Sequence, residues 1–135
     1  MVNLRYAEPQ DFYRCSRCAV DRPAEEFLFS EGSKTPRKYI CRSCTNIKNK
    51  EQYKFRLLLM QQIKLERGCS DCGYNEYAEA LDFDHRPGEV KLYVPAYMPK
   101  RLLSMEKIIA EIAKCDVVCA NCHRVRTLKR KRGDI

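Results

Sequence analysis

Two pairs of cysteines near the start of the chain have the spacing of zinc ligands. The first pair, in "CSRC", is Cys15 and Cys18, and the second, in "CRSC", is Cys41 and Cys44. A Cys-x-x-Cys turn places two thiolates at the separation that tetrahedral zinc requires, and two such turns complete a four-cysteine shell. The sequence therefore predicts a structural zinc here. Unrelated buried cysteines are one alternative, and a redox dithiol is another, which the missing βαβ pattern disfavours.

A second set of four cysteines is split across a long segment. Cys69 and Cys72 lie in "CSDC", and Cys119 and Cys122 lie in "CANC". The segment between them contains a predicted strand and a predicted helix, which can return the chain to its starting point, so we expect a second structural zinc. Cys115 is left over from the nine cysteines. Because it follows an apolar run, we interpret it as a small core residue.

The chain has only two histidines, and both lie beside this second set. Closing the second zinc site would bring His85 and His123 together. Asp84 offers a hard oxygen ligand for a divalent cation, and His123 a nitrogen ligand beside it. His85 is then free to act as a base near neutral pH. This set of groups suits phosphodiester hydrolysis, which closed all-cysteine zinc shells could not catalyse for lack of an open position.

The local patterns predict the elements that would hold these residues. "ALDFDH", residues 80–85, alternates apolar and acidic side chains as a half-buried strand does. A helix is expected from Ser104, with a short strand at 116–118 and a helix after it. Residues 86–103, with three prolines, are expected to form a loop. Upstream, residues 46–67 predict a helix ending at Gly68, and "EFLF" and "KYI" are candidate short strands.

Together these elements predict a small α+β protein stapled by zinc. The 135 residues are expected to divide into a zinc-ribbon-like module at 1–45, a connecting helix at 46–67 and a second zinc-stapled domain at 68–135. The net charge of +8 would fall to about +4 with eight thiolates around two Zn²⁺ ions. The position of the basic residues, more than the net charge, is therefore what indicates a polyanionic partner. Six candidate phosphate-binding residues crowd the C-terminal segment: Arg124, Arg126, Lys129, Arg130, Lys131 and Arg132.

No secretory h-region and no apolar stretch of membrane-spanning length is apparent. We therefore expect a soluble intracellular protein without a membrane partner. In a reducing compartment Cys-x-x-Cys pairs more often hold metal than form disulfides, and an odd cysteine count also disfavours a secreted disulfide-bonded protein.

Two segments resemble the HNH endonucleases, in particular the small zinc-containing kind of bacteriophages and bacteria. They are "CSDCGYNEYAEALDFDH" and "EIAKCDVVCANCHR", and the similarity covers about residues 67–127. The resemblance implies the ββα-metal motif, with Asp84 and His123 as ligands of a catalytic Mg²⁺ or Mn²⁺ and His85 as general base. It also implies DNA as the substrate, products with 5′-phosphate and 3′-hydroxyl ends, and the cytoplasm of a bacterial or phage-infected cell.

The middle residue of the HNH pattern is left with two candidates. The usual asparagine position falls around residues 114–116, where this chain has none, and Asn121 is the only asparagine between the two histidines. We expect Asn121 to orient the base or the site, with Asp116 as its competitor.

The leading hypothesis is thus a metal-dependent DNA endonuclease that carries two structural zinc ions. The alternative is a non-catalytic zinc-stapled nucleic-acid-binding or adaptor protein, which explains the cysteines and the basic tail but leaves the placement of both histidines to coincidence. The chain could act as a monomer or a homodimer.

Overall fold

The computed structural model describes residues 9–101 and 103–134 and divides the chain into two compact units. The division falls between Glu51 and Gln52, inside helix α1 (Arg42–Arg67). This helix begins earlier than the expected position 46, because the second cysteine turn leads directly into it and Cys44 already lies in its first turn. It ends as expected before Gly68, whose positive φ of 65° suits a glycine after a helix.

The first unit is built around a short hairpin that precedes and follows the first cysteine turn. Strand β1 (Phe12–Arg14) pairs antiparallel with β2 (Asp21–Pro23), and Tyr13 points into a small core with Phe27. The strands expected at "EFLF" and "KYI" are wrong: Phe29 forms only an isolated bridge with Pro36, and residues 38–40 form no strand. The prolines and glycine around them favour turns over a continuous ladder.

The second unit is centred on an antiparallel hairpin of β3 (Leu81–His85) and β4 (Cys115–Cys119). Both strands were expected, although β4 is longer than residues 116–118. Leu81, Phe83 and Val117 lie on one face and pack into the core with Ile108 and Ile112 of α2 (Met105–Ile112). Ser104 caps α2 as predicted, since its side chain accepts a hydrogen bond from the Lys107 backbone N–H at 3.4 Å.

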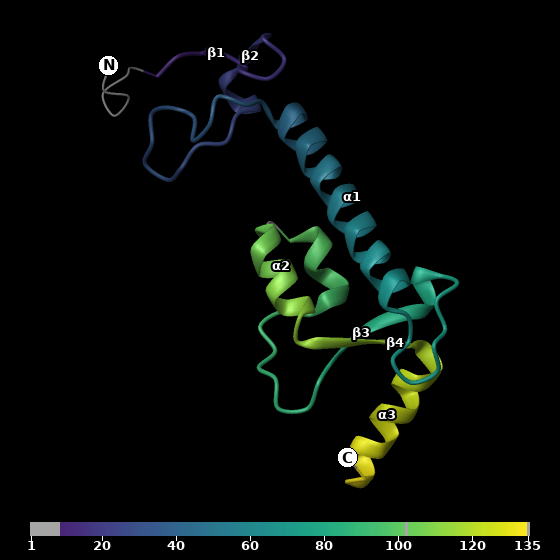
Figure 1. Cartoon of the computed structure of the whole chain (residues 1–135). Helices are drawn as coiled ribbons and strands as arrows, with labels where there is room; N and C mark the ends of the chain where they lie inside the picture. The colour runs from purple at the N-terminus through teal and green to yellow at the C-terminus, as the bar shows by residue number, and fades with distance from the viewer. Residues whose placement is uncertain (1–8, 102, 135) are drawn as a thin grey trace. The chain divides into compact units, whose positions relative to one another are not determined.

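Helix α3 (Ala120–Arg132) follows β4 without a loop and covers the other face of the hairpin. Figure 1 shows α2 and α3 on opposite sides of β3 and β4. The predicted half-buried strand is therefore buried on both faces near its end, where Asp84 is only 4% exposed. The loop expected at 86–103 contains a short 3₁₀ segment, η4 (Pro95–Lys100).

The structure thus confirms a small mixed α+β architecture. No helix among the described residues is both long and apolar enough to cross a membrane. Residues 1–8, on which the expectation of no secretory segment partly rests, lie outside the described residues.

Candidate functional site

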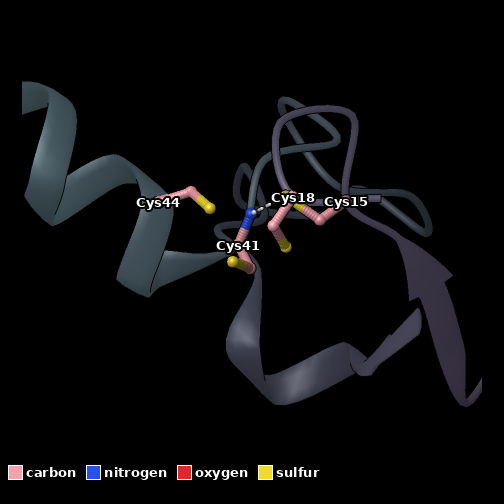
Figure 2. Close-up of side chains that lie close together, drawn as sticks. All are labelled: Cys15, Cys18, Cys41 and Cys44. Carbon is pink, nitrogen blue, oxygen red and sulfur yellow. Dashed lines mark hydrogen bonds between the residues drawn. The ribbon is translucent and has the colours of Figure 1, made fainter. Parts of the chain in front are cut away.

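The first cysteine set converges as its spacing predicts. Potential ligand atoms of all four cysteines lie within 4.8 Å of one another, a span that fits the four sulfur positions around one zinc ion. Figure 2 shows the two turns facing each other, with Cys44 supplied by helix α1. The backbone N–H of Cys41 donates to the sulfur of Cys15 at 3.4 Å. Backbone donors, led by that of Cys18, lower the pKa of Cys15 to about 6, whereas burial raises that of Cys44 to about 12, so within this set the protein itself favours the thiolate at Cys15.

The second cysteine set also closes, despite the long segment between its halves. The sulfurs of Cys69, Cys72, Cys119 and Cys122 lie within 4.8 Å of one another, and those of Cys72 and Cys119 are 3.7 Å apart. Cys119 is the last residue of β4 and also the N-cap of α3, where its sulfur accepts from the Cys122 backbone N–H at 3.5 Å. This zinc-compatible cluster therefore fixes the start of α3 against the end of the hairpin.

Cys115 takes no part in either cluster, as predicted. It is 2% exposed within the core of the second unit, and its thiol donates to the backbone carbonyl of Glu111 at 3.5 Å. Burial raises the pKa of Cys115 to about 11, so it is a neutral core residue.

The three residues predicted to act together line one cleft of about 310 Å³ in the second unit. Asp84 and His85 reach it from the end of β3, and His123 reaches it from the first turn of α3. Five uncharged residues and two cations complete the lining: Phe83, Leu92, Tyr93, Val94, Pro95, Lys91 and Arg101. The structure therefore brings an aspartate, two histidines and two cations to the same small volume.

His123 lies between two carboxylates of β3. Its Nδ1 is 3.1 Å from Asp82 Oδ2, and its Nε2 is 3.7 Å from Asp84 Oδ1. When the ring is neutral, donation from Nδ1–H to Asp82 leaves the lone pair on Nε2, on the side of Asp84. A histidine that ligates a metal is commonly fixed by a carboxylate in this way.

Asp84 is held by two arginines of α3. Arg130 binds its two oxygens at 2.9 and 2.7 Å, and Arg126 binds one of them at 3.3 Å. Burial by itself would raise the pKa of Asp84, but hydrogen bonds and charge from Arg130 outweigh it and lower the pKa. The carboxylate is therefore ionised.

Arg126 and Arg130, which the sequence predicts as phosphate contacts, are thus both paired with carboxylates of the protein itself. Arg126 also forms a two-pronged ion pair with Asp71, at 2.6 and 2.8 Å, and a bond of 2.9 Å to Asp116. A helix that packs its arginines onto an acidic hairpin face neutralises buried carboxylates, which costs less than leaving them alone. The other four basic residues of the predicted set remain exposed: Arg124, Lys129, Lys131 and Arg132.

His85 is paired with a buried acid that the sequence analysis missed. Its Nε2 lies 2.8 Å from Oε1 of Glu111, and the side chains are 5% and 1% exposed. Burial by itself would raise the pKa of Glu111, but hydrogen bonds from His85, Lys114 and two backbone N–H groups lower it to about 2. A signal was present in the sequence, because Glu111 occupies the apolar face of α2 between Ile108 and Ile112.

Neither candidate for the middle position lines the cleft. Asn121 is exposed and borders a separate hollow beside Cys72 and Cys119. Asp116 lies opposite Asp84 in the hairpin register and pairs with Arg126 and Arg86. Asp82, Lys91 and Arg101 were also missed, since nothing in their local sequence separates them from ordinary surface charges.

The fold and the two clusters define a small α+β protein with two four-cysteine groups that could each hold a zinc ion. No family model, no curated protein and no solved structure matches the chain.

Proposed function

We propose that the protein is a metal-dependent DNA endonuclease of the HNH type. One observation carries the proposal: a single cleft is lined by Asp84, His85 and His123 together with two cations. These are the groups that hydrolysis of a phosphodiester needs, namely a base for water, ligands for a cation and positive charge for the flanking phosphates.

The order of the elements around the cleft supports the same assignment. The ββα-metal motif is two strands and a helix with the active site between them, and here the hairpin of β3 and β4 is followed by α3, with cleft residues on β3 and α3. Asp84 and His85 end the first strand, and His123 lies in the first turn of the helix. The second cysteine cluster would act structurally, by fixing that helix against the hairpin.

Asp84 and His123 fit a divalent cation such as Mg²⁺ or Mn²⁺ by the chemistry of their donors. The pair supplies one carboxylate oxygen and one neutral imidazole nitrogen, 3.7 Å apart, at a cleft open to solvent. Mg²⁺ is usually bound through few protein ligands and keeps several waters, so two protein donors suffice. When bound, the ion would stabilise the negative charge that develops on the phosphate and on the leaving 3′ oxygen.

Within this site His85 is the general base. Its ring takes a proton from the water that attacks the phosphorus, while Lys91 and Arg101 hold the substrate phosphates in the cleft. Neither cation has an ion pair within residues 9–101 and 103–134. Cleavage is expected to leave 5′-phosphate and 3′-hydroxyl ends.

The ion pair that Arg130 already makes with Asp84 favours a second function. Both of its oxygens already accept hydrogen bonds from Arg130, so a cation has to displace a guanidinium to reach them. If that displacement does not occur, the protein would be a non-catalytic zinc-stapled module that binds nucleic acid through its exposed basic residues.

Cleavage of supercoiled plasmid separates the two functions. Wild type and His85→Ala are each incubated with Mg²⁺, with Mn²⁺ and without added divalent ions, and zinc content and DNA affinity are measured in parallel. If the protein is a nuclease, we expect metal-dependent nicking or linearisation of the plasmid by wild type. His85→Ala should abolish this cleavage and retain zinc content and DNA binding. Binding of DNA without cleavage by wild type, or full cleavage by His85→Ala, would reject it.

A further inference from the structure

The carboxylate of Glu111 is a fully occupied acceptor at the back of the cleft. Its Oε1 accepts from the backbone N–H groups of Leu92 and Tyr93 at 3.0 and 3.2 Å and lies 2.8 Å from His85 Nε2. Its Oε2 accepts from the Lys114 ammonium at 2.9 Å. Two backbone N–H groups and an ammonium can only donate to this carboxylate, and these three donors favour its ionised form.

An ionised carboxylate fixes the tautomer of the histidine beside it. Glu111 has no proton to donate, so the 2.8 Å contact requires that His85 Nε2 carries the hydrogen. When the ring is neutral, the lone pair then lies on Nδ1. A carboxylate that accepts a hydrogen bond from one ring nitrogen of a histidine in this way leaves the other nitrogen to act as a base.

The other ring nitrogen of His85 reaches solvent. Nδ1 has no hydrogen-bond partner among the described residues. In that part of the chain, the only fully buried side-chain nitrogen or oxygen without a partner is Arg22 Nε, so Nδ1 is not sealed in the core. His85 lines the cleft, and Nδ1 is therefore the ring atom that a water in the cleft can approach.

We infer that Glu111 is a positioning residue of the proposed nuclease, which holds His85 in the Nε2–H tautomer and so makes Nδ1 the basic atom. The inference rests on the proposed function. In the hydrolysis of the phosphodiester, an O–H bond of the attacking water breaks and its proton moves to Nδ1 of His85, while the water oxygen forms a bond to phosphorus. The bond from phosphorus to the 3′ oxygen breaks, and that oxygen takes a proton from solvent. The imidazolium that results is stabilised by the Glu111 carboxylate.

Glu111 also has structural contacts, and the test has to separate them from its effect on His85. The backbone of Leu92 and Tyr93 and the side chain of Lys114 depend on the same carboxylate. Lys114 in turn donates to the carbonyl of Val90 at 3.0 Å. Lys114→Met is therefore a matched control, because it removes support from Glu111 and from this loop without touching the bond to His85.

The first measurement is the tautomer of His85 in wild type. Histidine labelled with ¹⁵N is observed above the ordinary histidine pKa of about 6.5, and His123→Ala assigns the two rings. We expect His85 to carry its proton on Nε2 and to show an unprotonated Nδ1. A proton on Nδ1 overturns the inference, and this measurement needs no variant of Glu111 to fold.

The second measurement compares Lys114→Met with the double variant Glu111→Gln, Lys114→Met in single-turnover cleavage. In this background the glutamine oxygen can still accept from His85, and its NH₂ group no longer meets the lysine ammonium, so the change is mainly loss of charge. We expect a rate lower by about 10²-fold at saturating protein, with DNA affinity and zinc content unchanged, since general base catalysis contributes about 10²–10⁴-fold.

The outcomes distinguish this inference from the function on which it rests. Equal rates for the two proteins overturn the stabilisation of the imidazolium by the Glu111 charge and leave the nuclease intact, whereas the tautomer is decided by the first measurement. A loss confined to DNA affinity, with the same rate at saturation, also overturns it, because it indicates a structural role in the cleft wall. Absence of cleavage by wild type overturns the proposed function itself.

Discussion

The Nδ1 atom of His123 lies 3.1 Å from Oδ2 of Asp82, in the strand next to the helix that carries the histidine. This contact leaves Nε2 on the side of Asp84, at 3.7 Å from its Oδ1. A similar arrangement occurs at His85, where Glu111 accepts a hydrogen bond from Nε2 at 2.8 Å. Each histidine of the cleft therefore has its own carboxylate partner, and the two partners expose opposite ring nitrogens.

Asp82→Asn is expected to weaken binding of Mn²⁺ by about 10- to 100-fold, because the asparagine no longer fixes the ring of His123 by charge. Calorimetric titration of the zinc-loaded protein with Mn²⁺ measures the effect without any cleavage assay. Glu79→Gln is the control, since Glu79 is an exposed carboxylate that bonds Gln61 outside the cleft. Equal affinities for the two variants would contradict the role of Asp82.

Arg130→Met is expected to tighten Mn²⁺ binding. Arg130 holds both oxygens of Asp84, and a cation that ligates this carboxylate has to displace the guanidinium. Because hydrogen bonds to charged groups contribute about 1.5–3 kcal/mol, an increase in affinity of about tenfold or more is expected. Lys131→Met, one residue along and exposed, controls for the loss of general positive charge. A decrease in affinity for Arg130→Met alone would show that the arginine supports the metal site.

Zinc content is expected to follow the two cysteine clusters. Elemental analysis should find two zinc ions per chain in wild type, one in Cys41→Ser and one in Cys119→Ser. Cys115→Ala should retain both ions, because Cys115 lies outside the clusters. Only Cys119→Ser is expected to disorder α3 and abolish cleavage. A Cys115→Ala protein that loses zinc would show that the ligand sets are wrong.

The cations of the cleft and those of the C-terminal segment are expected to have different effects. Lys91→Ala with Arg101→Ala should lower the cleavage rate at saturation, since both side chains line the cleft with His85. Neutralising the exposed Lys129, Lys131 and Arg132 should instead weaken DNA binding at low salt. The slope of log affinity against log salt should become shallower by about 0.9 for each DNA phosphate that the protein no longer neutralises. Identical effects of the two sets would contradict this division.

The stability difference between wild type and Glu111→Gln is expected to shrink in acid. The pKa of Glu111 is lowered from 4.5 to about 2, so the ionised form stabilises the fold above about pH 4.5. That contribution is lost as pH falls from about 4.5 towards 2, where His85 and Lys114 lose their ionised partner. Urea unfolding of both proteins across this range measures the difference. Zinc loss in acid affects both alike, and a difference independent of pH would argue against an ionised Glu111.

The sequence predicted what depends on short spacing. The two cysteine turns of each cluster, the strand at Leu81–His85 and the cap at Ser104 follow from local patterns, and the structure confirms them. Convergence of His85 and His123 on one cleft follows from closing the second cluster. Local sequence does not contain the partners of charged groups across the fold. Arg126 and Arg130 were therefore predicted only as phosphate contacts, and their ion pairs with Asp84 were not foreseen.

Cys119 ends β4, caps α3 and belongs to the cluster that also contains Cys69, in the turn that follows α1. The cluster thus joins the turn after α1 to the start of α3, and the cleft takes residues both from β3 and from α3. During translation, Asp84 and His85 emerge from the ribosome well before His123 and the arginines that neutralise Asp84. The order of synthesis therefore keeps the cleft incomplete until the final helix is available, and under the proposed function a nascent chain would be inactive.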